Sequence, residues 1–101
     1  MRRALSLANE ALRDLDAIRR WHTQPGAGRA AAARIRQIRT AIQGLKAHPC
    51  RYPHGAHPGT RELASAGHRV VYEVDPDTGD NRTAGDVMVL RVYGPGQARD
   101  P

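Results

Sequence analysis

The sequence predicts an α+β fold of order β-α-α-β-β-β, in which two helices pack on one face of an antiparallel sheet. Apolar residues recur every three or four positions between Ala8 and Leu45, and then alternate with polar residues between Thr60 and Tyr93. A segment rich in proline and glycine separates the two patterns. The chain has 101 residues, so we expect one domain spanning residues 1–101.

The first half is expected to open with a short edge strand at Arg3–Leu7 and to continue as two helices. The first helix is expected from Ala8 to Trp21 or His22, because Leu12, Leu15 and Ile18 keep helical spacing. Pro25 and two glycines break it within residues 23–28. The second helix is expected at Arg29–Ala47, with an apolar stripe of Ala31, Ile35, Ile38, Ile42 and Leu45. Both stripes then require a flat apolar surface to cover them.

The second half is expected to supply that surface. Residues 48–59 contain three prolines and two glycines, and they predict an irregular loop. Strands are expected at Thr60–Ser65, His68–Val74 and Val87–Tyr93. Ala66-Gly67 predicts a tight turn between the first two strands, and residues 75–85 predict a long polar turn before the last.

Alternation along the strands divides their side chains between two faces. His68, Val70, Tyr72 and Val74 share one face, and Arg69 lies on the other. We expect Tyr72 to meet the helices together with Met88, Leu90 and Val92. Arg69 and Arg91 should then project from the open face of the sheet, where Arg69 can pair with Glu62 or Glu73.

The charge of the chain points to an anionic partner. The net charge is +6, and Lys46 is the only lysine among 16 basic residues. No acidic residue lies between Asp16 and Glu62, so the positive charge is concentrated in the helical half. A basic nucleic-acid-binding module is one reading, in which phosphate contacts would dominate because only four aromatic residues are present.

Other classes of site are disfavoured. No apolar run is long enough to span a membrane, so we expect a cytoplasmic protein without a membrane partner. Cys50 is the only cysteine, which excludes an internal disulfide bond. The spacing of His48, His54 and His57 matches no familiar zinc pattern, and we expect neither a metal nor a cofactor.

Several local sequences, in this order, resemble the RelE/ParE superfamily, the toxins of bacterial type II toxin–antitoxin systems. They are Ala11-Leu-Arg-Asp-Leu15, Ile42-x-x-Leu45 before Pro49, Gly59-Thr-Arg-Glu-Leu63, Gly67-His-Arg-Val-Val-Tyr72 and Val87-Met-Val-Leu-Arg-Val-Tyr93. The resemblance covers essentially the whole chain. It implies a helical hairpin on a curved antiparallel sheet, and a cognate antitoxin whose complex sets the oligomeric state.

The resemblance leaves two targets open. RelE-like members cleave ribosome-bound mRNA, and in that reading Arg69 matches the catalytic-type arginine of the family. The catalytic candidates are then Arg61, Arg69, Arg91 and Arg99, with His68 or Tyr93 to move protons. RelE-type enzymes carry a basic segment after the last strand, whereas this chain has Gly94-Pro-Gly-Gln-Ala-Arg99.

ParE-like members inhibit DNA gyrase, and this is the main reading. It needs a binding surface and no catalytic set, which suits the altered C-terminal segment. The residues expected to form that surface are Arg34, Arg36, Arg39, Arg61, Arg69, Arg91, Gln97 and Arg99.

Overall fold

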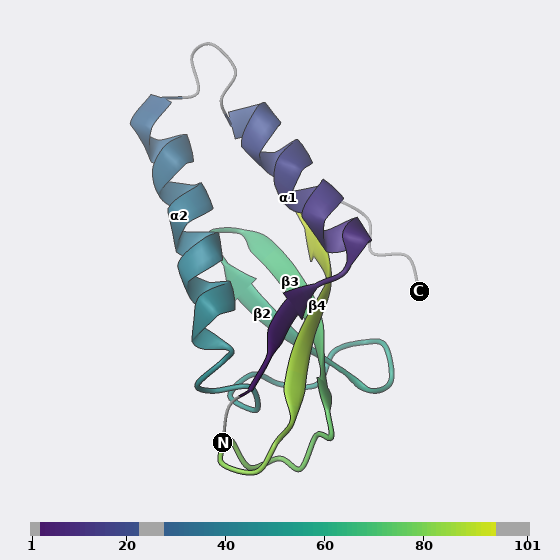
Figure 1. The fold of residues 1–101 in the computed structure, drawn as a ribbon. Helices are drawn as coiled ribbons and strands as arrows, with labels where there is room; N and C mark the ends of the chain where they lie inside the picture. The colour runs from purple at the N-terminus through teal and green to yellow at the C-terminus, as the bar shows by residue number, and fades with distance from the viewer. Residues whose placement is uncertain (1–2, 23–27, 95–101) are drawn as a thin grey trace.

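The computed structural model describes residues 3–22 and 28–94 and contains the expected order of elements. The elements are β1 (Leu5–Leu7), α1 (Asn9–His22), α2 (Gly28–Gly44), β2 (Thr60–Ser65), β3 (His68–Asp75) and β4 (Asp86–Tyr93). The two helices lie side by side and run in opposite directions, and both pack against one side of the sheet (Figure 1). The α+β fold class is therefore confirmed.

The sheet has four strands in the order β1-β4-β3-β2. β3 pairs antiparallel with both β2 and β4, as expected. β1 pairs parallel with β4, with Leu5 opposite Val87 and Leu7 opposite Val89, so the sheet is mixed rather than wholly antiparallel. Parallel neighbours need a long crossover connection, and the intervening helices and strands supply it.

The sequence predicts that the second helix ends at Ala47, but α2 ends at Gly44. The next residues form a tighter turn, in which the Leu45 amide donates to the Ile42 carbonyl at 3.0 Å and the Lys46 amide to the Gln43 carbonyl at 3.2 Å. Hydrogen bonds from an amide to the carbonyl three residues earlier are common in the last turn of a helix. Leu45 remains fully buried, so its predicted place in the core is correct.

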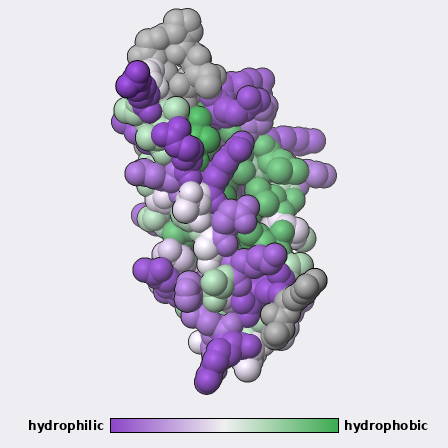
Figure 2. Space-filling view, turned by 60° about the vertical axis from the view of Figure 1, so that its left-hand side comes forward, coloured by the Kyte–Doolittle hydropathy of each residue, from purple (hydrophilic) through white to green (hydrophobic). Residues whose placement is uncertain are grey.

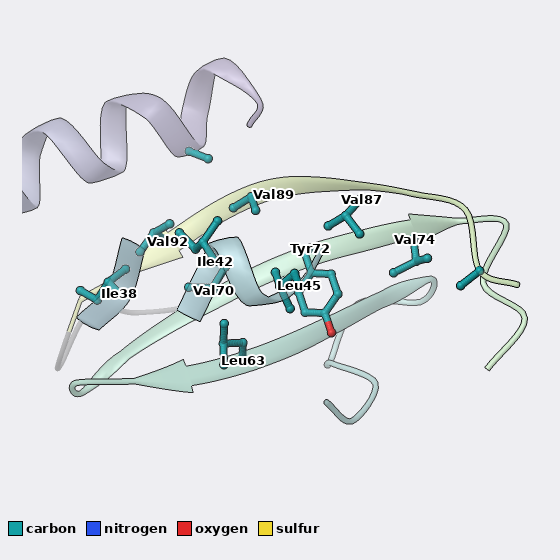
Figure 3. Packing of buried hydrophobic residues seen from close by; sticks show 12 residues of the cluster. Ile38, Ile42, Leu45, Leu63, Val70, Tyr72, Val74, Val87, Val89 and Val92 are labelled. Carbon is teal, nitrogen blue, oxygen red and sulfur yellow. The ribbon is translucent and has the colours of Figure 1, made fainter. Parts of the chain in front are cut away.

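The core lies between the two helices and the inner face of the sheet, and α2 supplies most of the helical side chains in it (Figure 3). Ile38 and Ile42 of α2 face Val70 and Tyr72 of β3, and all four are almost completely buried. The Tyr72 hydroxyl donates a 2.7 Å hydrogen bond to the Pro49 carbonyl. Tyr72 therefore joins the centre of the core to the irregular loop before β2.

The side of β4 that enters the core differs from the prediction. Val87, Val89 and Val92 are buried, whereas Met88 is 39% exposed and Leu90 is partly exposed. The register shifts between β3 and β4, so that Tyr72 pairs with Val89 and Val71 pairs with Arg91. Leu90 is the extra residue of this β-bulge, and it reverses the alternation midway along the strand. Val92 was predicted correctly, while Met88 and Leu90 were not.

The tight turn between β2 and β3 is confirmed. Ala66 and Gly67 both have positive φ, at 50° and 78°. Positive φ at both central residues is typical of the two-residue hairpin turn whose twist matches that of the flanking strands. This turn fixes the antiparallel register of β2 and β3, and with it the positions of Arg61 and Arg69.

Candidate functional site

Arg61 is buried beneath the loops at the base of the sheet. Its side chain is 9% exposed and forms an ion pair with Asp77, with Nε 2.8 Å from Oδ2 and Nη2 3.0 Å from Oδ1. Nη1 donates to the Tyr52 carbonyl at 2.6 Å. This pairing lowers the pKa of Asp77 below its ordinary value, chiefly through the hydrogen bond from Arg61. Arg61 therefore holds two loops together, and its burial argues against the surface role expected from the sequence.

A second network secures the same end of the molecule. Arg3 donates to the carbonyls of Asn81 at 2.6 Å, Ala84 at 2.7 Å and Gly85 at 2.8 Å. The Asn81 side chain in turn accepts a 2.7 Å bond from the Cys50 amide. Burial raises the pKa of the Cys50 thiol, which disfavours the reactive thiolate. The sequence carries no local signal for these contacts, because their partners lie far apart along the chain.

Arg69 is the catalytic-type arginine of the resemblance, and its side chain is 51% exposed. Nη1 lies 3.3 Å from Glu62 Oε1, so one of the two expected ion pairs is present. Glu62 is itself fixed, because its Oε2 accepts a 3.1 Å bond from the Ala56 amide. The loop approaches so closely that a Cβ on Gly55 would lie 2.6 Å from Glu62 Oε2. Arg69 thus faces a carboxylate that the loop holds in place.

A shallow hollow of about 510 Å³ lies beside Arg69 and Glu62. Its lining residues are Tyr52, Pro53, His54, Gly55, Ala56, Glu62, Ala64 and Arg69. It brings a cation, a carboxylate and a histidine to one place on the surface.

Arg91 was expected on the open face of the sheet, but it reaches α1. Its Nε lies 2.8 Å from Asp14 Oδ2 and its Nη2 lies 3.2 Å from Oδ1. The same Oδ2 accepts a 2.8 Å bond from the Val92 amide. β1 pairs with β4 only as far as Val89, so Asp14 supplies an acceptor where the pairing stops. Arg91 lies opposite Val71 in the register of β3 and β4, and its side chain reaches Asp14 along the part of β4 that β1 does not pair with.

Replacing Asp14 with alanine is expected to lower the free energy of unfolding by about 2 kcal/mol, because a charged acceptor is lost from Arg91 and from the Val92 amide. Asp16→Ala is the matched control on the same helix. Asp16 is 46% exposed and binds Arg19 and Arg20 at the surface, so its replacement should lower the free energy of unfolding much less than that of Asp14. Urea denaturation measures both, and equal losses would contradict the role assigned to Asp14.

The α2 arginines of the expected binding surface are exposed. Arg34, Arg36 and Arg39 form no ion pair with another described residue. Figure 2 views the molecule from the side on which α2 comes forward, and hydrophilic side chains stand out there with apolar surface between them. Gln97 and Arg99 lie outside the described residues.

The groups expected to move protons are buried. His68 is 2% exposed, and its Nδ1 lies 2.9 Å from the Ala66 carbonyl oxygen, as its inward alternation predicted. Tyr93 is 8% exposed, and the Arg91 guanidinium lies 4.9 Å from the centre of its ring. Within residues 3–22 and 28–94, no group of three histidine, cysteine or acidic side chains is placed to hold a metal ion. No helix in the same ranges is long and apolar enough to cross a membrane.

Comparison with known proteins agrees with this fold. A chain of the chromosomal ParDE toxin–antitoxin system from P. aeruginosa matches with a TM-score of 0.70 and 18% identity, covering 92% of this chain and 96% of that one. A chain of the RelBE2 toxin–antitoxin complex from Mycobacterium tuberculosis matches with a TM-score of 0.56 and 22% identity, covering 96% and 95%. No curated protein was found to match.

The sequence itself matches a family over residues 5–94, from β1 to the end of β4. That family is described as the ParE toxin of the type II toxin–antitoxin system parDE. The chain therefore belongs to the ParE toxin family, within the RelE/ParE superfamily of type II toxin–antitoxin systems.

Proposed function

We propose that this toxin inhibits DNA gyrase by binding to it, and that a cognate antitoxin holds it inactive. The observation that carries the proposal is the pairing of the three candidate catalytic arginines that lie within the described residues. Arg61 binds Asp77, Arg69 binds Glu62 and Arg91 binds Asp14. RNA cleavage needs cationic groups directed at the charge that develops on the phosphate. A toxin that acts by binding needs only an accessible surface.

The antitoxin is the second part of the proposal. The similar solved structures come from toxin–antitoxin systems, which favours a protein partner for this chain. Leu12 on α1 and Met88 on β4 are large apolar side chains that are 52% and 39% exposed. Such residues suit the apolar centre of a protein interface.

Ribosome-dependent mRNA cleavage remains the second candidate because of the hollow beside Arg69. Arg69 is half exposed there and lines the hollow together with His54. A phosphate that displaced Glu62 would meet a free guanidinium. The test of function therefore needs a ribosome experiment beside the gyrase experiment.

The test adds purified toxin to a gyrase supercoiling reaction and, separately, to ribosomes translating a defined message. We expect supercoiling to stop while the message stays intact, and addition of the antitoxin to restore supercoiling. Cleavage of the message on ribosomes with supercoiling unchanged would replace the proposal with the second candidate.

Arg69→Ala is expected to raise the toxin concentration needed for half-inhibition of gyrase about fivefold to tenfold, since arginine is enriched among the interface residues whose removal costs more than about 1 kcal/mol. The melting temperature should hardly change, because the pair with Glu62 is half exposed. Arg82→Ala removes an 89% exposed arginine from the distant 75–85 turn and should leave inhibition unchanged. Equal inhibition by both variants would remove Arg69 from the binding surface.

A further inference from the structure

α2 carries several arginines whose charge is not paired with any carboxylate among the described residues. Its 17 residues include Arg29, Arg34, Arg36 and Arg39 and no acidic residue. All four side chains are exposed, and none forms an ion pair with another described residue. On α1, by contrast, Arg19 and Arg20 both bind Asp16.

The arginines of α2 lie largely in one row. At 3.6 residues per turn, Arg29, Arg36 and Gln43 are stacked two turns apart, and Arg39 lies beside them. Arg29 and Arg36 lie on the side of α2 opposite Ile38 and Ile42, which enter the core, and Arg39 lies at the flank between them. Arg29 and Arg36 are separated by about 10 Å along the axis, which is about the axial rise of three phosphates on one DNA strand.

A shallow hollow of about 630 Å³ adjoins this row, between α2 and the end of β2. Its lining residues are Ala33, Arg36, Gln37, Thr40, Ala41 and Ser65. Guanidinium, amide and hydroxyl groups can all donate hydrogen bonds, and the lining contains no carboxylate. The two alanines leave room for a group to approach closely. This chemistry suits a phosphate.

We propose that the outer face of α2, defined by Arg29, Arg36, Arg39 and the hollow beside Arg36, binds the phosphate backbone of duplex DNA. This inference goes beyond gyrase inhibition and does not depend on it. Arginine is well suited to phosphate because its planar group makes paired hydrogen bonds. The contact carries no base-edge readout, so the binding is independent of DNA sequence.

Duplex DNA fits this face better than the alternatives. Protein interfaces are usually anchored by large apolar or aromatic side chains. The large apolar side chains that are exposed among the described residues, Leu12 and Met88, lie on α1 and β4. Single-stranded nucleic acid is usually held by stacking on aromatic rings, and α2 has no aromatic residue.

The test measures fluorescence anisotropy of a labelled duplex of mixed sequence, titrated with the full-length toxin in the absence of gyrase. The variant R29Q/R36Q/R39Q removes the row. The matched control R13Q/R20Q/R82Q removes the same charge from exposed positions on α1 and in the 75–85 turn. Circular dichroism melting verifies that both variants fold.

We expect the wild-type affinity to fall with salt, with a log–log slope of about −2.7 or steeper for three phosphate contacts. The row variant should bind at least tenfold more weakly with a slope nearer zero, while the control stays within about threefold of wild type. Equal losses in the two variants would overturn the proposal. Equal or tighter binding of a poly-glutamate peptide, or of a single strand, would also overturn it in favour of that ligand. A gyrase assay that failed while this binding held would refute the proposed function alone.

Discussion

Replacing Arg61 with alanine is expected to lower the free energy of unfolding by about 3 kcal/mol, because it leaves a largely buried aspartate without its partner. The Asp77 side chain is only 21% exposed, so water cannot fully replace the guanidinium. The Tyr52 carbonyl loses its donor as well. Small domains are stable by only about 5–15 kcal/mol, so this change removes a large share. Urea denaturation at neutral pH measures it.

Arg82→Ala is the matched control for this prediction. Arg82 also pairs with an aspartate of the 75–85 turn, Asp80, but its side chain is 89% exposed and the charged atoms lie 3.6 Å apart. Exposed pairs contribute about 0.5 kcal/mol, so a loss of that size is expected. Similar losses in the two variants would show that burial does not govern the strength of the Arg61–Asp77 pair.

The same pair predicts a dependence of stability on pH. The hydrogen bond from Arg61 lowers the pKa of Asp77 below its ordinary value of 3.8. A carboxylate with a lowered pKa stabilises the fold above that ordinary value, and the stabilisation is lost as the pH falls through the folded-state pKa. In wild type the free energy of unfolding should therefore fall on acidification below about pH 4. In Arg61→Ala this part of the acid dependence should be reduced.

The sequence predicted the elements of the fold well because their signals are local. The apolar stripe of α2 and the turn at Ala66-Gly67 depend on residues close together in the chain. The misassigned side of β4 had a different origin. A bulge adds one residue, here Leu90, without leaving a mark in the alternation of a strand rich in valine and leucine. The parallel pairing of β1 was likewise decided by the three-dimensional path of the chain.

The candidate site was harder to predict for the same reason. Sequence reasoning found arginines on the strands, but could not tell an arginine that binds a partner from one that binds an aspartate far along the chain. Asp14 and Arg91 are separated by 77 positions, and Arg61 and Asp77 by 16. Among these ion-pair partners, only Glu62 was predicted, as a partner of Arg69 on the neighbouring strand. The absence of ion pairs for the arginines of α2 was easier to predict, because a helix without acidic residues offers them no carboxylate at helical spacing.

Tyr72→Ala is expected to have the largest effect on stability, a loss of about 4 kcal/mol, because truncating a large buried ring leaves a cavity. Tyr72 is 0% exposed and its ring lies beside Leu45 in the core (Figure 3). Burial also raises the pKa of its hydroxyl, which stays protonated and can donate to the Pro49 carbonyl at 2.7 Å. Urea denaturation at neutral pH again measures the change.

Tyr72→Phe separates the ring from its hydroxyl. It keeps the packing and removes only the hydrogen bond to Pro49, so a loss of about 1.5 kcal/mol is expected. Tyr52→Phe is the control, because the Tyr52 hydroxyl makes no hydrogen bond to another described residue and its removal should change little. If Tyr72→Phe destabilised the protein as much as Tyr72→Ala, the loop contact rather than the packed ring would hold this part of the core. If Tyr72→Phe did not change the stability, the loop that carries Pro49 would be anchored chiefly by Arg61. The losses expected for Arg61→Ala and Tyr72→Ala would then arise independently, one in the loops and the other in the core.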